Sequence, residues 1–465
     1  MASSNHYKTI NPATGQLVRS FPDSTDLDVS KALSTAQECF EKDWRWRTAS
    51  SRAEIMTRAA GLIRDRTAQL AEIATKDMGK LYTEACYEVS LSADILEYFA
   101  VNAESFLRPT TVQERGSGAV AEVVSEPIGI IVAVEPWNYP YYQLARVAGP
   151  QLMAGNVVLA KHAASVPQCA LAFAKIFEDA GAPPGAYTNI FGSRSQMNQL
   201  VDDFRVRGVT LTGSEAAGAG VAERAGRHLK KVVLELGGSD PFVVLEDANL
   251  EAAISRASSG RLVAMGQVCA APKRFIVVGK ERGDLFLEGV KQHFSSLEAG
   301  DPMDPKTTIG PVFSESALQT LLEQIHRAVE HGATLVCGGK RIDRPGFYLE
   351  PTILTNISAE NPIYKEEMFG PVAMMFSVDT DDAAVELANA TRYGLGSSVN
   401  SEDPKHARAV ADRIDAGMVF INSCTVTLPE LPFGGIKNSG FGRELSDLGF
   451  SEFLNKKLIR MAPTN

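Results

Sequence analysis

The fold is constrained most by short apolar runs that alternate with helical patterns from Ile128 to about Phe420. The first series contains IGIIVAV, VVLA, RVRGVTL and KKVVLEL, with TNIF as a weaker member. A second series, with PFVVLE and KRFIVV, follows Glu235. Apolar strands that alternate with helices are typical of parallel sheets covered on both faces. The sequence therefore predicts an α/β protein with two open sheets.

The two series also indicate the domain boundaries. Helical periodicity fills the region from about Asp26 to Phe106 and is expected to cover the first sheet. We predict one Rossmann-like domain from residues 1–108 and 129–235, and a second from residues 236–425.

Two remaining stretches, residues 109–128 and 446–465, alternate weakly between apolar and polar residues. We expect a small β element here, in which the C-terminal strand pairs with GSGAVAEVVSEP or with a neighbouring chain. An exposed amphipathic strand is an edge that favours association. The element therefore predicts a homodimer or homotetramer.

Composition and charge exclude several classes of partner. The chain has 465 residues, of which 45% are hydrophobic and 22% charged, with a net charge of −10. These values are ordinary for a globular protein, and the acidic balance argues against nucleic acid or an anionic membrane as partner. No apolar run approaches the roughly 18 residues of a membrane span, and the opening is too polar for a signal peptide. Six scattered cysteines without a CxxC pair are a poor pattern for zinc or disulfides. We therefore predict a cytoplasmic protein with free thiols and no metal site.

Cys269, in MGQVCAAPKR, is the candidate nucleophile. A cysteine taken alone is more often structural and buried. Here Gly266 precedes it and two alanines follow, so the backbone can turn tightly and be approached closely. A nucleophilic thiol needs an electropositive pocket or a neighbouring base.

Two further residues have the chemistry that such a thiol requires. Glu235 ends an apolar run before Gly237 and Gly238, which predicts a position at the carboxyl edge of a sheet, where ligands bind. A partly desolvated glutamate there is a candidate general base, although a solvated strand end is the alternative. Asn138, in EPWNYP, is a candidate oxyanion donor or else a turn former beside proline.

Gly213 and Ser214, in TLTGSEAAGAG, are expected to open a helix directly after a strand. A helix N-terminus of this kind can bind a pyrophosphate through its N–H groups and dipole. The sequence is not GxGxxG, so a tight helix start without a ligand is the alternative.

Taken together, these motifs resemble the aldehyde dehydrogenase family. The matching segments keep one order along the chain: INPATG, PWNYP, the lysine of VVLAKHA, TGS, LELGG, GQVC, EEMFGPV and PFGGIKNSGFGRE. The details of TGSEAAG, LELGGSDPFVVLEDANL and KHA are most similar to the bacterial-type succinate semialdehyde dehydrogenase branch. The resemblance implies that the first domain binds a nicotinamide dinucleotide and that the second is catalytic.

The resemblance also implies a role for each matching residue. Cys269 would attack the aldehyde carbon, the Asn138 amide would hold the oxyanion, and Glu235 would activate the water that hydrolyses the thioester. The cofactor residues would be Lys161 at the adenosine ribose, Ser214 with the Gly213 backbone at the pyrophosphate, Glu367 and Phe369 at the nicotinamide ribose, and Trp137, which alone is more often a packing residue.

Cofactor preference depends on the residues that follow Lys161. NAD-preferring relatives often carry a glutamate at the position of Ala164. Without that carboxylate a 2′-phosphate is not repelled, and Lys161, with His162 or Arg194, would attract it. We therefore expect NADP or dual use, with NADP slightly favoured over NAD.

The substrate end of the site is less strongly marked. Arg146 matches a position at which semialdehyde dehydrogenases bind the remote carboxylate, and an ordinary helical salt bridge is the alternative. The Tyr139 to Tyr142 region adds aromatic surface, and Tyr142 is expected to contact the substrate, so we expect a semialdehyde such as succinate semialdehyde, or an aromatic aldehyde. Close relatives usually have asparagine in place of Val263 or Ala264, which weakens the semialdehyde assignment.

Two other functions fit parts of the pattern. A CoA-acylating semialdehyde dehydrogenase shares the fold but generally lacks the glutamate of LELGG, so Glu235 argues against it. A catalytically silent structural or binding relative would not need Cys269, Glu235 and Asn138 together.

Overall fold

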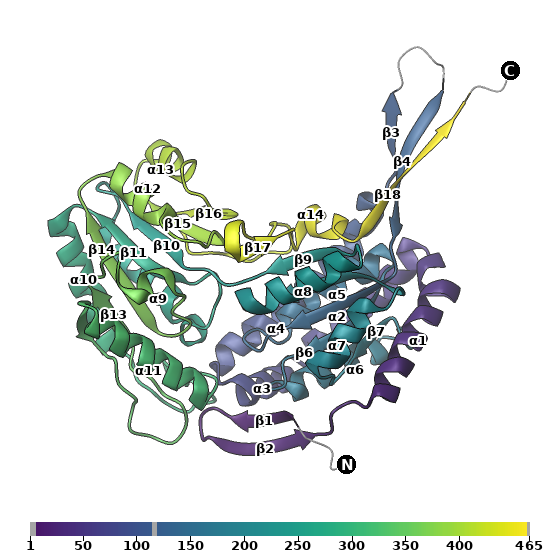
Figure 1. Cartoon of the computed structure of the whole chain (residues 1–465). Helices are drawn as coiled ribbons and strands as arrows, with labels where there is room; N and C mark the ends of the chain where they lie inside the picture. Colours follow the sequence, from purple (N-terminus) through teal and green to yellow (C-terminus); the bar gives the residue numbers. More distant parts are fainter. Residues whose placement is uncertain (1–5, 114–118, 463–465) are drawn as a thin grey trace.

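Two open sheets form the body of the protein (Figure 1). The computed structural model describes residues 6–113 and 119–462. In spatial order, the six-stranded sheet contains β17 (Gly440–Phe441), β9 (Lys231–Glu235), β8 (Val206–Thr212), β5 (Ile130–Glu135), β6 (Val157–His162) and β7 (Tyr187–Asn189). The seven-stranded sheet contains β12 (Thr334–Cys337), β13 (Thr352–Thr355), β14 (Val372–Val378), β11 (Pro272–Val278), β10 (Asp240–Val244), β15 (Gly396–Asn400) and β16 (Met418–Ile421).

Most neighbouring strands in both sheets are parallel. One edge pair of each sheet, β17 with β9 and β12 with β13, is antiparallel. Five strands of the six-stranded sheet match the first predicted series, including the weak member TNIF, which overlaps β7. The sixth strand, β17, was not predicted, and it adds a segment from near the C-terminus to the edge of this sheet. The predicted α/β class with two open sheets is confirmed.

Helices cover both sheets, and their ends follow local sequence signals. The helices that surround the six-stranded sheet are α1 (Asp26–Lys42), α2 (Ala49–Asp65), α3 (Thr67–Met78), α4 (Tyr82–Phe106), α5 (Tyr142–Ala154), α6 (Pro167–Asp179), α7 (Arg194–Asp202) and α8 (Glu215–Arg227). Those around the seven-stranded sheet are α9 (Leu250–Leu262), α10 (Lys280–Ser295), α11 (Glu315–Glu330), α12 (Asp381–Asn389) and α13 (Pro404–Ala411). Helix α14 (Ser446–Ser451) packs on α4 and α5 of the first half. Short 3₁₀ turns lie at Trp44–Trp46, Val263–Gly266, Pro362–Lys365 and Lys437–Ser439. Thr25 and Asp28 form a capping box at α1, and Gly79 ends α3 in the left-handed conformation.

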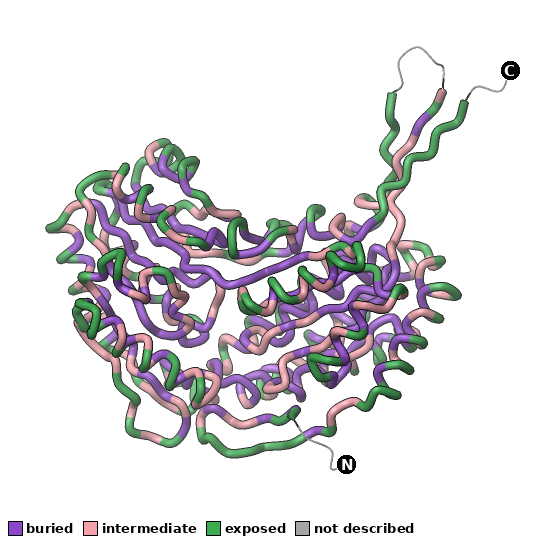
Figure 2. Tube along the Cα trace, viewed as in Figure 1, coloured by how far each residue is buried: buried purple, intermediate pink, exposed green. Residues whose placement is uncertain are grey.

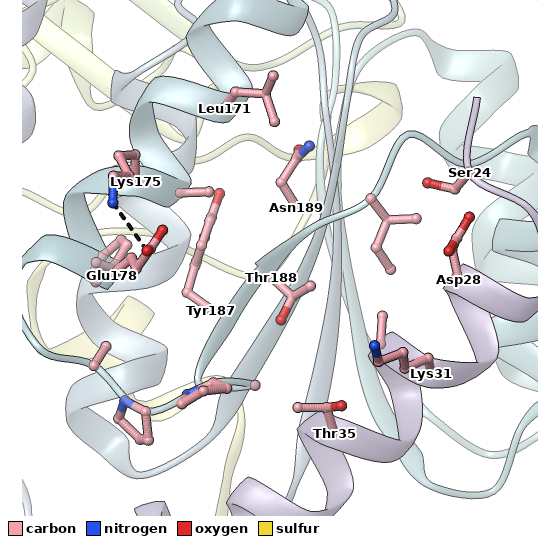
Figure 3. A pocket seen from close by; sticks show the side chains of 18 residues that line it. Ser24, Asp28, Lys31, Thr35, Leu171, Lys175, Glu178, Tyr187, Thr188 and Asn189 are labelled. Atoms are coloured by element: carbon pink, nitrogen blue, oxygen red, sulfur yellow. Dashed lines mark ion pairs between the residues drawn. The ribbon is translucent and has the colours of Figure 1, made fainter. Parts of the chain in front are cut away.

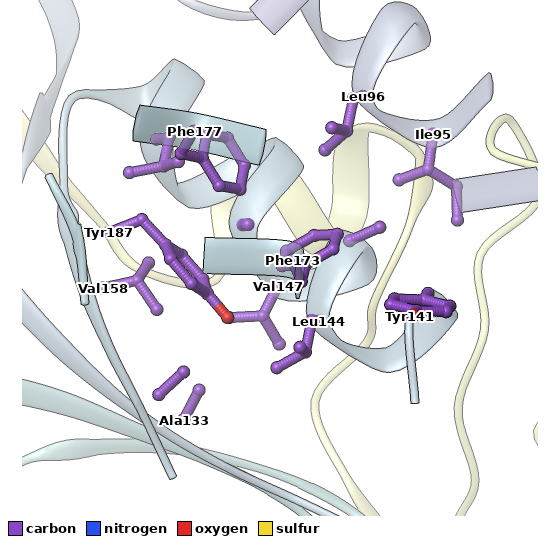
Figure 4. Packing of buried hydrophobic residues seen from close by; sticks show 14 of the residues in the cluster. Ile95, Leu96, Ala133, Tyr141, Leu144, Val147, Val158, Phe173, Phe177 and Tyr187 are labelled. Atoms are coloured by element: carbon purple, nitrogen blue, oxygen red, sulfur yellow. The ribbon is translucent and has the colours of Figure 1, made fainter. Parts of the chain in front are cut away.

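Helix α5 is the centre of the first core. All of its residues are buried, between the six-stranded sheet and α4. In Figure 4 its residues Leu144 and Val147 lie among Phe173 of α6, Tyr187 of β7 and Ile95 of α4. The polar side chains of this buried helix, Gln143, Arg146 and Gln151, have hydrogen-bond partners inside the protein, as burial requires. Because α5 follows directly after PWNYP, this packing holds the Asn138 loop at the end of β5.

A third sheet projects from the body (Figure 1). It joins β3 (Thr110–Gln113), β4 (Val120–Pro127) and β18 (Leu454–Met461), and β18 pairs antiparallel with β4 from Leu454↔Pro127 to Met461↔Val120. The predicted pairing of a C-terminal strand with this segment is confirmed. Within the predicted strand stretch 446–465, however, Ser446–Ser451 forms α14 and the strand begins only at Leu454. The first residues of GSGAVAEVVSEP, 116–118, lie outside the described residues. Most of β18 is exposed, as Figure 2 shows. Its role in oligomerisation stays a prediction.

The N-terminal hairpin of β1 (Tyr7–Asn11) and β2 (Gln16–Phe21) packs against α3 and α6. Among the helices of the described part of the chain, none has both the length and the apolar character that crossing a membrane requires.

Candidate active site

The predicted site residues come from adjacent strand ends. Asn138 follows β5, Gly213 follows β8 and Glu235 ends β9. Because these three strands are parallel neighbours, their carboxyl ends share one edge of the sheet. Cys269 precedes β11 of the other sheet, and a side chain at Gly238 would meet its carbonyl oxygen at 3.0 Å. The nucleophile loop therefore lies where the two sheets meet.

A cavity of about 250 Å³ opens beside Cys269. Asn138, Tyr142 and Arg146 line it together with Cys269, so four of the predicted residues meet there. The remaining wall is largely apolar and includes Tyr87, Leu91, Val263, Val268, Val426 and Phe433. Glu235 is 2% exposed and is not among the lining residues.

Burial controls the thiol of Cys269. It raises the pKa of this thiol to about 11, while the nearby cations Arg146 and Lys273 act in the opposite direction. The thiol is therefore protonated at neutral pH in this state. Formation of the thiolate requires a base or a further positive charge in the cavity.

Glu235 has the properties of a buried general base. Burial raises the pKa of its carboxyl well above the usual range, and the Glu444 carboxylate raises it further. Arg146 lowers it. Gly434 lies beside the carboxylate, because a side chain there would meet Glu235 Oε1 at 2.6 Å. A glutamate with a raised pKa can accept a proton near neutral pH.

Asn138 is held in place from two sides. Its Nδ2 donates to the Gln267 carbonyl oxygen over 2.9 Å, and its amide lies 2.8 Å from that of Gln143. A side-chain NH₂ has two protons, so one remains for an oxyanion in the cavity. The position is 4% exposed, which keeps water from competing for that proton.

Lys273 is a further residue of the site that the sequence motifs do not reveal. Its ammonium is fully buried, donates to the Cys269 carbonyl oxygen over 2.6 Å and lies 3.3 Å from Glu367 Oε1. Glu367 also accepts from the Gly238 N–H over 3.1 Å. The lysine is visible in VCAAPKR, but a basic residue at the start of a strand gives no sign that it is buried.

Aromatic residues surround the predicted nicotinamide end. Trp137 stacks on Phe313 with ring centroids 3.5 Å apart, and meets Phe369 edge-on at 5.8 Å. Trp137 and Phe369 are predicted from the sequence to lie near the cofactor, whereas Phe313 is not. Nothing in its local sequence, GPVFSES, marks Phe313 as part of this cluster.

The start of α8 has the geometry of an anion site. Ser214 is its N-cap and accepts from the Ala217 N–H, and Gly218 packs so closely that a side chain would overlap Leu236. The Gly213 N–H donates to the Glu235 carbonyl oxygen over 3.0 Å, so it is not available to a pyrophosphate. Gly213 instead allows a ligand to approach the backbone closely, because it has no side chain. Of the first helical turn, the N–H groups of Glu215 and Ala216 remain for a pyrophosphate.

Two cations lie near the predicted ribose site. Lys161 is half-buried at the end of β6, and its Nζ lies 5.9 Å from the centroid of the Tyr7 ring. Burial and the positive charge of Arg194 both lower the pKa of Lys161, which shows that the two cations repel each other. Ala164 lies nearby without a carboxylate. A bound phosphate would relieve this repulsion, so the residues present fit a 2′-phosphorylated dinucleotide.

Of the two residues expected to assist Lys161, His162 or Arg194, the prediction for His162 is wrong. Its ring is fully buried and contacts the carbonyl oxygens of Pro140 and Glu135. Burial lowers the pKa of His162 to about 4, so it is neutral at pH 7. Successive residues of a strand point to opposite faces, which is why His162 and Lys161 have different surroundings.

Arg146 is buried at the inner end of the cavity. It forms an ion pair with Glu444 and donates to Tyr142 Oη over 3.0 Å and to Thr212 Oγ1 over 2.9 Å. A guanidinium has five N–H donors, so two remain after these contacts. Burial keeps the pKa of Tyr142 above its usual range, and its hydroxyl therefore remains a donor.

A larger groove of about 840 Å³ lies elsewhere, between α1 and α6 beside the edge strand β7. Figure 3 shows Lys31 and Asp28 on one side, with Lys175 and Glu178 on the other. None of the predicted site residues lines it. Within residues 6–113 and 119–462, no group of three or more His, Cys, Asp or Glu side chains is placed to hold a metal.

Comparison with known proteins agrees with this geometry. The chain is 47% identical to a succinate-semialdehyde dehydrogenase [NADP(+)] of Deinococcus radiodurans, over 98% of this chain and 95% of that protein. It superposes with a TM-score of 0.96 on a succinic semialdehyde dehydrogenase from Streptococcus pyogenes in complex with NADP+, at 44% identity, over 98% of this chain and all of the other. The solved structure of Gox0499 gives a TM-score of 0.96 at 51% identity, over 98% and 99% of the two chains. The model of the aldehyde dehydrogenase family matches residues 1–459, and the chain belongs to that family.

Proposed function

We propose that this protein oxidises an aldehyde that carries a remote carboxylate, of the succinate semialdehyde type, to the carboxylic acid with NADP as hydride acceptor. One observation carries the proposal: Cys269 shares a small, largely apolar cavity with the guanidinium of Arg146 and the hydroxyl of Tyr142. The relatives named as NADP-dependent succinate-semialdehyde dehydrogenases support the same choice.

The chain's own residues account for each chemical step. The Cys269 thiol gives its proton to water, and the resulting thiolate sulfur bonds to the aldehyde carbon as the C=O π electrons move to oxygen. The oxyanion accepts from the Asn138 amide and the Cys269 N–H. Bound NADP supplies the hydride acceptor. Loss of hydride from the thiohemiacetal leaves a thioester on Cys269. Glu235 then takes a proton from water, whose oxygen attacks the thioester and releases the acid and the thiol.

The choice of NADP rests on charge. Lys161 and Arg194 repel each other, and Ala164 provides no carboxylate to oppose a 2′-phosphate. Two cations with no competing anion favour the phosphorylated cofactor. NAD lacks the phosphate, so its binding gains nothing from relief of this repulsion.

The choice of substrate rests on hydrogen-bond donors of Arg146 and Tyr142 that have no acceptor within the described part of the protein. After its contacts with Glu444, Tyr142 and Thr212, Arg146 retains two N–H groups, and the Tyr142 hydroxyl can also donate. A substrate carboxylate would accept these bonds. The apolar wall supports a second candidate, an aromatic aldehyde that binds by packing alone.

Initial rates with succinate semialdehyde and benzaldehyde, each with NADP and NAD, test the proposal. Tyr142→Phe is the sharpest variant, because it removes one hydroxyl and keeps the ring. We expect it to raise KM for succinate semialdehyde about 10-fold, the effect of one lost charge-assisted hydrogen bond, and to leave KM for benzaldehyde unchanged. Equal effects on both aldehydes, or faster turnover of benzaldehyde by the unmodified protein, would refute the carboxylate assignment.

Added CoA separates hydrolysis from acyl transfer, and formation of acyl-CoA in place of the free acid would favour the CoA-acylating alternative.

A homodimer or homotetramer and a cytoplasmic location stay predictions. Size-exclusion chromatography that finds a compact monomer would refute the first.

A further inference from the structure

One helix contacts both loops of the reaction centre. Glu88 of α4 is fully buried, and its Oε1 accepts from the Tyr141 N–H over 2.7 Å and from the Tyr142 N–H over 3.1 Å. These two residues begin α5 directly after the loop that carries Asn138. Glu88 therefore anchors the oxyanion loop by a charged acceptor, the stronger class of hydrogen bond.

Glu84, one turn earlier on α4, contacts the other loop. Its Oε1 accepts from the Ala264 N–H over 2.9 Å. Ala264 and Met265 have φ values of 48° and 55°, in the left-handed region that non-glycine residues rarely adopt. Such a conformation persists only where its surroundings hold it. Glu84 thus holds the strained start of the segment that leads to Cys269.

The two loops are joined to each other at the active site. The Ala264 carbonyl oxygen accepts from the Gln267 N–H over 3.1 Å and from Gln267 Nε2 over 2.9 Å. The Gln267 carbonyl oxygen in turn accepts from Asn138 Nδ2 over 2.9 Å. A closed ring of contacts therefore runs from α4 through Glu84, the nucleophile loop and Asn138 back to Glu88.

Lys80 makes this arrangement electrostatically possible. It forms an ion pair with Glu88, both side chains are almost completely buried, and its Nζ lies 3.7 Å from the centroid of the Tyr139 ring. A buried carboxylate without such a partner would take up a proton and lose strength as an acceptor.

We propose that Lys80, Glu84 and Glu88 are positioning residues that set the separation between the Asn138 amide and Cys269. None of them lines the cavity, so their effect reaches the aldehyde only through the two loops. The inference goes beyond the proposed function, because it applies to any aldehyde that the protein oxidises.

The experiment is a double-mutant cycle between this helix and the oxyanion donor. Lys80→Met/Glu88→Leu removes the anchor without leaving a buried charge, and it is compared in the Asn138 and Asn138→Ala backgrounds. Lys80→Met/Glu88→Gln restores a neutral acceptor. Glu104→Gln, an exposed glutamate of the same helix, is the matched control. Rates are measured with NADP and with both succinate semialdehyde and benzaldehyde. The test therefore remains valid even if the proposed substrate is wrong.

We expect Lys80→Met/Glu88→Leu to lower kcat about 10- to 100-fold while KM for NADP changes less than about 3-fold, because sub-ångström misplacement of a donor costs rate rather than cofactor binding. The Gln version recovers most of the loss. In the Asn138→Ala background the same change lowers kcat less than about 3-fold. An equal loss in both backgrounds, or an unchanged kcat in a folded variant, overturns the proposal. If the double variant does not fold, Glu84→Leu takes its place in the same cycle, with the same outcomes.

Discussion

The Lys273 ammonium lies between the nucleophile loop and Glu367: it donates to the Cys269 carbonyl oxygen over 2.6 Å and is 3.3 Å from Glu367 Oε1. It also donates to the carbonyl oxygens of Val268 and Ala271. One buried cation thus holds two groups in place. The first is the turn that carries the Cys269 thiol, and the second is the Glu367 carboxylate, which is predicted to orient the nicotinamide ribose.

Lys273→Met is expected to destabilise the protein and weaken cofactor binding. It leaves three carbonyl oxygens and the Glu367 carboxylate without their cation, and breaking a buried ion pair typically costs about 3–5 kcal/mol. Urea unfolding measures the stability and initial rates measure KM for NADP. Lys291→Met, at an exposed pair with Glu288, is the control. A Lys273→Met protein as stable as that control would contradict this role.

Alkylation of Cys269 should accelerate steadily with pH. Burial raises the pKa of its thiol to about 11, and only the thiolate reacts. Below that pKa the thiolate fraction grows tenfold per pH unit, so the rate with iodoacetamide should rise without a plateau from pH 7 to about 9.5. The same measurement on Cys269→Ala subtracts the other five thiols. A plateau near pH 8 would mean that the thiol is already activated in the free protein.

Glu444→Gln should shift the acidic limb of the kcat profile to lower pH. Glu235 acts as a base only when it is unprotonated, and burial followed by the Glu444 carboxylate raises the pKa of Glu235. Removing that negative charge lowers the Glu235 pKa, so activity appears at lower pH. The exposed Glu430→Gln should leave the limb where it is. A shift of the Glu444→Gln limb to higher pH would show that Glu444 does not oppose ionisation of Glu235.

Ala164→Glu should change the cofactor preference. The new carboxylate would repel a 2′-phosphate and accept from a 2′-hydroxyl, so kcat/KM should fall at least about 10-fold for NADP and rise for NAD. Arg194→Gln should lower kcat/KM for NADP and leave that for NAD unchanged. If both cofactors respond equally to Arg194→Gln, the arginine does not contact the phosphate.

The sequence predicted those parts of the fold and site that depend on local pattern. The alternating apolar runs predicted both sheets, and parallel strand ends explain why Asn138 and Glu235 share one edge. The pairing of β18 with β4 followed from the weak alternation of both segments. These predictions depend on two local features: apolar residues at every second position of a strand, and the point where a strand ends.

What the sequence did not predict depends on tertiary surroundings. His162 follows Lys161 directly, yet its neutral state results from burial beneath Pro140, which no local pattern reveals. The roles of Lys273 and Phe313 likewise depend on partners 94 and 176 positions away, Glu367 and Trp137. The pairing of β11 with β14 in one sheet brings Lys273 near Glu367, whereas Trp137 and Phe313 meet because the two halves of the chain pack together.

The proposed reaction requires that an acyl group forms on Cys269 and that Glu235 removes it. Mass spectrometry of Glu235→Gln protein, quenched in acid after mixing with NADP and succinate semialdehyde, detects that acyl group itself. We expect one NADPH per site in a burst and one acyl group on the peptide that contains Cys269. A Cys269→Ser protein that oxidises aldehydes at the unmodified rate, or steady turnover of Glu235→Gln with no acyl group on Cys269, would contradict it.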